Sequence, residues 1–159
     1  MYKYSMMKKL VMLTMAMGMF GILTTRAQCN YETALGLGID FGDGQTLVGP
    51  SVKHFFTENH AGMGEVVFGD NVTFLTLMYQ YHEEFPNADG FQWFAGGGPS
   101  IAFFDGNSDV FLRPVVGLDY KIANVPLAFS FDWRPWIYLG NSNNGFEAAR
   151  FGLGFRYTF

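Results

Sequence analysis

Hydrophobic and polar residues alternate one by one through most of the chain after residue 27. The C-terminal segment shows this best, with Ala149, Phe151, Leu153, Phe155, Tyr157 and Phe159 at one set of positions and Arg150, Gly152, Gly154, Arg156 and Thr158 between them. A period of two puts successive side chains on opposite faces of a β-strand. The alternation recurs in seven earlier segments, so we predict eight strands, over residues 31–41, 51–56, 63–68, 75–82, 91–103, 112–121, 125–135 and 149–159.

The two faces of these strands differ in an unusual direction. One face carries large aromatic and aliphatic side chains, and the other carries mainly Gly, Ala and Ser with a few charges. A soluble sandwich or barrel would have an outward face rich in polar side chains. Bulky apolar residues suit a wall that faces lipid, while small residues and paired charges suit a narrow lumen. Because an open sheet edge is costly in hydrocarbon, we predict an all-β fold, an eight-stranded antiparallel up-and-down transmembrane β-barrel.

Seven segments rich in Gly, Asn, Asp or Pro separate the predicted strands. They are residues 42–44, 59–62, 69–71, 86–90, 105–109, 123–126 and 140–145. These residue types favour turns. With both ends of the mature chain in the periplasm, the first, third, fifth and seventh connections would face the outside of the cell.

Residues 1–27 have the three-part composition of a secretory signal peptide. Residues 1–9 contain three lysines, residues 10–23 are apolar at all but one position, and Thr25 and Ala27 are small residues at −3 and −1 of a cut. The apolar run is shorter than the roughly 20 residues that a membrane-spanning helix needs, so we expect cleavage rather than anchoring. The chain then divides into a signal peptide, 1–27, and an outer-membrane β-barrel, 28–159.

Composition and charge narrow the choice of function. The 159 residues are enough for one domain, and only 15% are charged, against about 25% in an average soluble domain. Four bases and no acid lie in residues 1–27, which leaves six bases and 14 acids in the rest and argues against a nucleic-acid partner. The single cysteine, Cys29, excludes an intramolecular disulfide and matches no zinc or redox spacing. Its position near the predicted cut leaves lipid attachment as an alternative.

The last five residues place aromatic side chains at the last, third-last and fifth-last positions, Phe159, Tyr157 and Phe155. This ending is similar to the C-terminal signal that the barrel assembly machinery recognises in Gram-negative outer-membrane proteins. Together with the signal peptide and the alternation, the mature chain resembles the small eight-stranded outer-membrane β-barrel families that include OmpX and the transmembrane domain of OmpA. The resemblance implies a location in the cell outer membrane, among its lipids and lipopolysaccharide.

The resemblance implies a location more firmly than an activity, because such barrels include structural tethers, adhesion and defence proteins, narrow pores and lipid A-modifying enzymes. Long outer loops, which carry recognition in many members, are missing here. A lipid A deacylase of this type would be expected to contain a His-x-Ser-Asn stretch, and none of His54, His60 and His82 begins one.

The small-residue faces also carry all six bases of the mature chain and five of its acids. The bases are Lys53, Arg113, Lys121, Arg134, Arg150 and Arg156, and the acids are Asp40, Glu65, Asp119, Asp132 and Glu147. Buried charges need partners, and the arginine fork binds carboxylates through two parallel hydrogen bonds. We therefore predict a salt-bridge network that fills and seals the lumen. The alternative is that these charges line a narrow ion path, but an eight-stranded interior is just wide enough for side chains to fill.

His82 and His54 are predicted to lie on opposite faces of the wall. His82 points inward, where it could act as a base for Ser100, although no third group would orient it. His54 is predicted to lie at the membrane interface.

Acids and aromatic residues are predicted near the outer end of the barrel. The acids of the predicted outer loops could bridge divalent cations to lipopolysaccharide phosphates or be solvated turn residues: Asp43, Asp70, Asp105 and Asp109. An aromatic girdle at the outer interface is predicted from Trp133, Trp136 and Tyr138, with a ligand platform as the alternative.

From these observations we predict a monomeric outer-membrane barrel with a structural or interaction role and no catalysis, cofactor or metal. The expected contacts are outer-membrane lipid, lipopolysaccharide and, during biogenesis, the barrel assembly machinery. A narrow passive pore or small-molecule channel is the main alternative, and a lipid A-modifying enzyme is the third hypothesis.

Overall fold

The computed structural model describes residues 31–140 and 145–159, so the predicted signal peptide and Cys29 lie outside the described residues. The strands in chain order are β1 (Thr33–Gly42), β2 (Gln45–Phe55), β3 (His60–Phe68), β4 (Thr73–Glu84), β5 (Phe91–Phe104), β6 (Asn107–Lys121), β7 (Leu127–Trp133), β8 (Trp136–Tyr138), β9 (Phe146–Glu147) and β10 (Arg150–Thr158). Among the described residues, no helix is long and apolar enough to cross a membrane.

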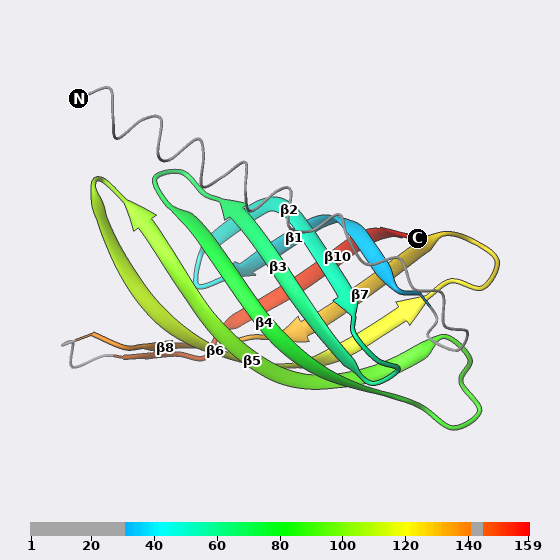
Figure 1. Ribbon diagram of the computed structural model, residues 1–159. Helices are drawn as coiled ribbons and strands as arrows, with labels where there is room; N and C mark the ends of the chain where they lie inside the picture. The colour runs from blue at the N-terminus through cyan, green and yellow to red at the C-terminus, as the bar shows by residue number, and fades with distance from the viewer. Residues whose placement is uncertain (1–30, 141–144) are drawn as a thin grey trace.

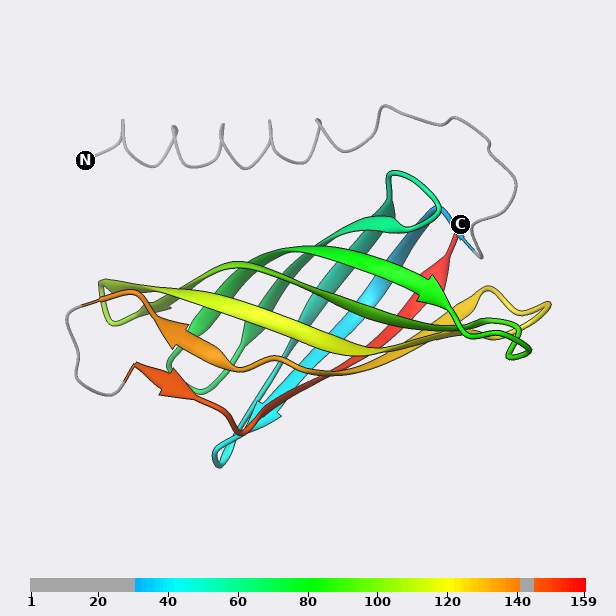
Figure 2. The ribbon, with the colours of Figure 1, turned by 90° about the horizontal axis from the view of Figure 1, so that it is seen from below.

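The strands close into an eight-stranded antiparallel barrel (Figures 1 and 2). Each strand from β1 to β6 pairs with the next one along the chain, β7 pairs with β10, and β10 pairs with β1. The short strands β8 and β9 continue β7 and β10, because β8 pairs with β6 and β9 pairs with β8. The prediction of an all-β, eight-stranded antiparallel barrel is therefore confirmed.

The two ends of the barrel differ in their connections. Figure 1 shows the C-terminus at one end, here called the terminal end, while the turns after β1, β3 and β5 lie at the opposite, far end. Two of the far turns consist of only two residues with positive φ: Asp43 (45°) with Gly44 (72°), and Asp105 (38°) with Gly106 (81°). Positive φ at both positions is the type I′ geometry, whose twist matches that of the flanking strands.

Two predicted turns lie at different residues in the structure. The second turn spans residues 56–59 rather than 59–62, because β3 already begins at His60. Gly62 therefore belongs to a strand, where a Cβ atom would come within 2.8 Å of the Phe56 ring. The fifth turn ends at Gly106 rather than at residue 109, because a type I′ Asp-Gly pair reverses the chain without further residues.

The barrel wall is irregular where β7 gives way to β8. Pro135 has no N–H to donate, which interrupts the ladder at this point. On the neighbouring strand, Phe151 faces Trp133 whereas Glu147 faces Trp136, so one strand advances four residues where the other advances three. This one-residue excess is a β-bulge, an irregularity that bends a strand locally and increases its twist.

The side chains are arranged inside out relative to a soluble protein. Among the described residues, 17 polar or charged side chains and 13 hydrophobic ones are buried. Large apolar side chains are instead exposed around the outer wall, with exposed fractions of 53% for Leu37, 52% for Leu77, 48% for Phe131 and 44% for Phe155. The predicted assignment of the small, ionic face to the interior therefore holds on these strands.

Candidate functional site

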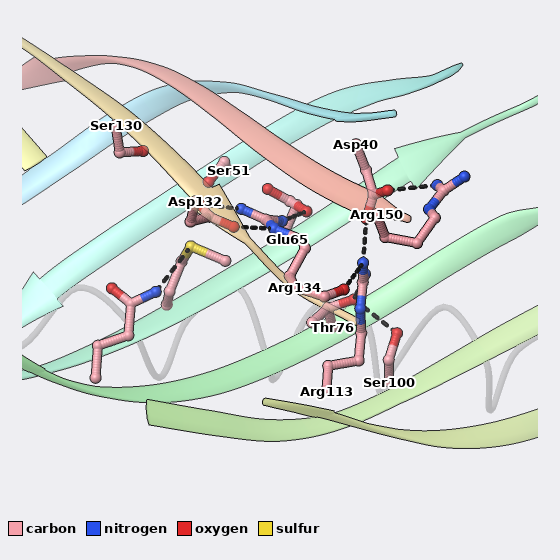
Figure 3. Close-up of polar contacts among 12 residues, drawn as sticks. Asp40, Ser51, Glu65, Thr76, Ser100, Arg113, Ser130, Asp132, Arg134 and Arg150 are labelled. Atoms are coloured by element: carbon pink, nitrogen blue, oxygen red, sulfur yellow. Dashed lines mark hydrogen bonds and ion pairs between the residues drawn. The ribbon is translucent and has the colours of Figure 1, made fainter. Parts of the chain in front are cut away.

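The first cluster in the barrel interior is built around Asp40 of β1. Its carboxylate forms ion pairs with Arg113 from β6 and Arg150 from β10, and all three side chains are at most 1% exposed. Arg150 also donates from Nη1 to the Gly42 carbonyl at 2.7 Å. One carboxylate thus joins two arginines from strands that are distant in sequence, as Figure 3 shows.

The second cluster is built around Arg134, which follows β7. Its Nη1 donates to Glu65 Oε1 at 2.8 Å, and its Nη2 donates to Asp132 Oδ2 at 2.7 Å while Nε bonds the other oxygen of Asp132 (Figure 3). This two-point contact is the geometry in which guanidinium binds carboxylate best. Glycine in the adjacent wall leaves room for this cluster, because a Cβ atom at Gly38 would lie 2.1 Å from Glu65 Oε2 and one at Gly152 would lie 2.1 Å from Arg134 Nη2. A larger residue would require these side-chain ends to shift.

A third cluster lies nearer the terminal end and contains lysine instead of arginine. Lys53 Nζ is 2.5 Å from Asp119 Oδ2 and 4.7 Å from the centre of the Phe94 ring. The Tyr31 hydroxyl, from the segment before β1, lies 3.2 Å from both oxygens of Asp119. Burial, and then the negative charge of Asp119, hold the pKa of Tyr31 well above its usual value, so this hydroxyl stays a donor.

Arg156 is buried among neutral hydrogen-bond acceptors. Its guanidinium donates to the Ser51 hydroxyl at 2.9 and 3.1 Å, to the Ser130 hydroxyl at 2.8 Å and to the Met63 sulfur at 3.4 Å. Within the described part of the chain no carboxylate forms an ion pair with it. Its hydrogen bonds are satisfied by neutral groups, while its charge is not neutralised by a contact.

Apolar layers enclose these polar clusters at both ends. At the far end, the layer consists of Leu47, Val67, Phe74 and Ala102, with Phe111 and Trp136 packed against it. At the terminal end, the layer consists of Tyr31, Ala34, Phe55, Ala61 and Ala128. The ionic network therefore lies between two apolar plugs and is separated from water on both sides.

Two of the predicted network residues lie elsewhere. Lys121 is only half-buried, and its ammonium donates to the carbonyls of Ile122 at 2.9 Å and Val125 at 2.6 Å. Glu147 accepts a hydrogen bond from the Ala149 amide at 3.0 Å. Both residues lie at strand ends. Their side chains have inward parity, but they contact the backbone of an adjacent turn or bulge instead of the charged side chains of the lumen. The prediction that they join the network is wrong.

The histidine–serine pairing considered from the sequence does not form. His82 is buried between Phe55 and Phe94, with ring-centre distances of 4.7 and 4.9 Å, and its Nε2 lies 3.2 Å from Gln80 Oε1. Ser100 instead shares a hydrogen bond of 2.7 Å with the Thr76 hydroxyl. His54 points outward, where its Nδ1 lies 2.9 Å from the Thr33 hydroxyl.

The predicted aromatic girdle is wrong for two of its three members. Trp133 is 40% exposed on the outer wall, but Trp136 and Tyr138 face inward. Trp136 lies beside the buried cations, 4.3 Å from Arg150 and 5.4 Å from Arg113 measured to its ring. The reason is strand geometry: residues an odd number of positions apart point to opposite faces, so Trp133 and Trp136 cannot share one.

The C-terminal aromatics lie on the outer wall at the terminal end. Phe155, Tyr157 and Phe159 are 44%, 49% and 70% exposed, and the Phe159 amide donates to the Thr33 carbonyl at 2.8 Å. Sequence reasoning missed Tyr31 and the neutral partners of Arg156 as members of the interior network. The inward parity of Ser51, Ser130 and Met63 was available as a signal, but nothing in the pattern indicated which charge each would contact. Tyr31 gave no such signal, because it shares the parity of the exposed Leu35 and Leu37 and enters the interior from the segment before β1.

Comparisons with protein-family models and with curated protein sequences find no match. Among the described residues, no three His, Cys, Asp or Glu side chains gather as a metal-binding group. The chemistry of the site must therefore be inferred from its own geometry. A closed barrel wall surrounds an interior that is filled by paired charges, hydroxyl groups and apolar plugs.

Proposed function

We propose that this protein is a sealed β-barrel of the bacterial cell outer membrane with a structural or interaction role. The observation that carries the proposal is the inversion of polarity, with buried ion pairs on the inside and a wide belt of exposed apolar side chains on the outside. A continuous apolar surface of this kind would drive aggregation in water, whereas in a bilayer it meets acyl chains. Barrel closure supplies every wall strand with two neighbours, as hydrocarbon requires.

The resemblance to small outer-membrane barrels supports the same location. The terminal aromatics Phe155, Tyr157 and Phe159 extend to the chain end on the lipid-facing wall, which is compatible with recognition by the barrel assembly machinery. Fractionation of cells that express the full chain tests the location. We expect heat-modifiable folded protein in the outer-membrane fraction, and recovery in the periplasm or culture medium would overturn the proposal.

The order of the layers along the barrel axis supports a sealed lumen. The apolar plug at the far end, the arginine clusters and the apolar plug at the terminal end leave the charges with each other rather than with water. We expect the wild-type protein to give no reproducible current steps in a planar bilayer. Steps that change size in an Arg113→Ala or Asp132→Asn variant would show instead that the lumen conducts, and would favour a narrow pore.

A role without catalysis is part of the same proposal. Most of the buried charged side chains form ion pairs, whereas Arg156 and His82 contact neutral groups. The Ser100 hydroxyl is bonded to a threonine rather than to a base. Mass analysis of lipid A from cells with and without the protein tests this. An unchanged acyl pattern is expected, and an altered one would overturn the proposed absence of catalysis.

A further inference from the structure

Beyond the sealed lumen, the far end of the barrel carries a cavity that the proposed function does not use. The cavity has a volume of about 320 Å³ and is lined by Asp109, Phe111, Trp136, Tyr138, Gly145, Phe146 and Glu147. Apart from Gly145, which precedes β9, these residues come from β6, β8 and β9, the strands that extend at this end (Figures 1 and 2). A volume at the low end of the range for ligand sites suits a small molecule.

Three aromatic rings of the cavity lining contact one another. The Phe111 ring lies 5.4 Å from Trp136 and 5.5 Å from Tyr138, measured between ring centres. The Tyr138 hydroxyl donates to Asp109 Oδ1 at 3.2 Å, which holds this ring against the carboxylate. The faces of electron-rich aromatic rings attract cations.

The charges around the cavity have a single sign. Asp109 and Glu147 line it, and no lysine or arginine does so among residues 31–140 and 145–159. The buried cations behind Trp136, Arg113 and Arg150, share the Asp40 carboxylate, and the adjacent Arg134 is outnumbered by two carboxylates. The positive and negative charges of the interior behind Trp136 are therefore balanced. The charge that a ligand would encounter in the cavity is that of the two carboxylates in the lining.

We propose that this cavity binds a small organic cation of the alkylammonium class. The aromatic rings would contact the methyl or methylene groups of the ligand, and Asp109 and Glu147 would balance its charge. This arrangement excludes anions by repulsion and discriminates against neutral molecules of equal shape, because they lose the electrostatic attraction to both rings and carboxylates. The inference rests on the far end of the barrel alone and does not depend on where the protein resides.

The test is a titration of the folded full-length protein in maltoside micelles, which contain no ammonium group. Choline is the probe, and 3,3-dimethyl-1-butanol is its uncharged isostere. The NMR signal of the Trp136 indole N–H, identified by its loss in Trp136→Phe, reports occupancy of the cavity. We expect a saturable shift with choline and at least about tenfold weaker binding of the isostere, the factor that corresponds to losing one to two cation contacts.

Matched charge variants distinguish the effect of the cavity carboxylates on binding from the effect of the general negative charge at this end. The double variant Asp109→Asn, Glu147→Gln should weaken choline binding about fivefold or more, the size expected for two partly exposed carboxylates. The control is Asp70→Asn, Asp105→Asn, because these two acids line a neighbouring cavity of about 490 Å³ at the same end. The control should change binding by less than about twofold, since its carboxylates act only through screened solvent.

Three results would overturn the proposal. One is the absence of a saturable Trp136 shift in a protein whose dispersed spectrum shows that it is folded. Another is equal binding of choline and its isostere, which would make the cavity a nonspecific apolar site. The third is equal weakening by both double variants, which would assign the effect to the acidic end as a whole. A conducting lumen, by contrast, would overturn the proposed sealed barrel and leave this inference standing.

Discussion

In the far half of the lumen three arginines face three carboxylates, whereas in the terminal half two bases face one. The far half holds Arg113, Arg134 and Arg150 with Asp40, Glu65 and Asp132, and the terminal half holds Lys53 and Arg156 with Asp119. The bases in both halves are buried to the same degree, at no more than 2% exposed. The difference lies in Arg156, whose acceptors are neutral groups, whereas the other four bases form ion pairs with carboxylates.

This difference indicates that the cost of removing a buried charge depends on what it leaves behind. Removing one member of a buried ion pair strands the other in a medium that solvates it poorly. Removing a charge that is bonded to hydroxyls leaves neutral groups, which can bond to each other or to water. Arg134 has the first kind of environment and Arg156 the second, although each makes several hydrogen bonds.

The largest effect is expected for Asp40→Asn. The change leaves Arg113 and Arg150 without a carboxylate and should lower the free energy of unfolding by about 3–5 kcal/mol. Urea titration of the refolded barrel, followed by heat-modifiable migration, measures the change. Asp43→Asn is the control, because this residue is exposed in the first turn and should shift stability by no more than about 0.5 kcal/mol. Equal effects would contradict the ion-pair account of the far half.

A matched pair of arginine variants tests the comparison directly. Arg134→Met leaves Glu65 and Asp132 buried without their cation and should cost about 3 kcal/mol. Arg156→Met leaves two serines and Met63 and should cost about 1 kcal/mol or less. The same urea titration applies to both proteins, which carry the same substitution at equally buried sites. A cost for Arg156→Met as large as that for Arg134→Met would remove the distinction between the two halves.

The smallest effect is expected for Tyr31→Phe in the terminal half. Loss of the hydroxyl that contacts Asp119 should cost about 1 kcal/mol near pH 7. Because the pKa of Tyr31 is raised in the folded protein, its contribution is complete below the unfolded pKa of about 10 and is lost as the pH rises through the folded value. The stabilities of the wild type and the variant should therefore converge above about pH 10. A difference that stays constant up to pH 11 would contradict this assignment.

The sequence was a good guide to the wall of the barrel. Eight segments with a period of two became the eight strands of the wall, and Asp43-Gly44 and Asp105-Gly106 formed turns where Asp and Gly indicated them. These features are local, since parity depends only on position along a strand and a type I′ turn depends on two residues. The errors were local as well: Gly62 was assigned to a turn, and Trp136 was assigned to the face of Trp133 despite their odd spacing.

From the sequence, the interior could be predicted only as a list of residues, without the contacts between them. Parity placed Asp40, Arg113 and Arg150 on the same side of the wall, but it could not say that one carboxylate would bridge two arginines. The partners are 73 and 110 residues apart in the sequence. Their meeting depends on how far the strands are staggered and on the bulge between β9 and β10, and neither shows in the hydrophobic pattern.

By itself, then, the order of amino acids determined how many strands the wall has and which side chains point to its axis, because alternation is a property of each strand alone. Only the closed tertiary structure decided which charges touch, that Arg156 contacts neutral groups, and that Lys121 and Glu147 lie outside the network. Contacts across the axis join residues at the same height in the barrel. Height is fixed by the register of every strand in the ring rather than by any one segment of the chain.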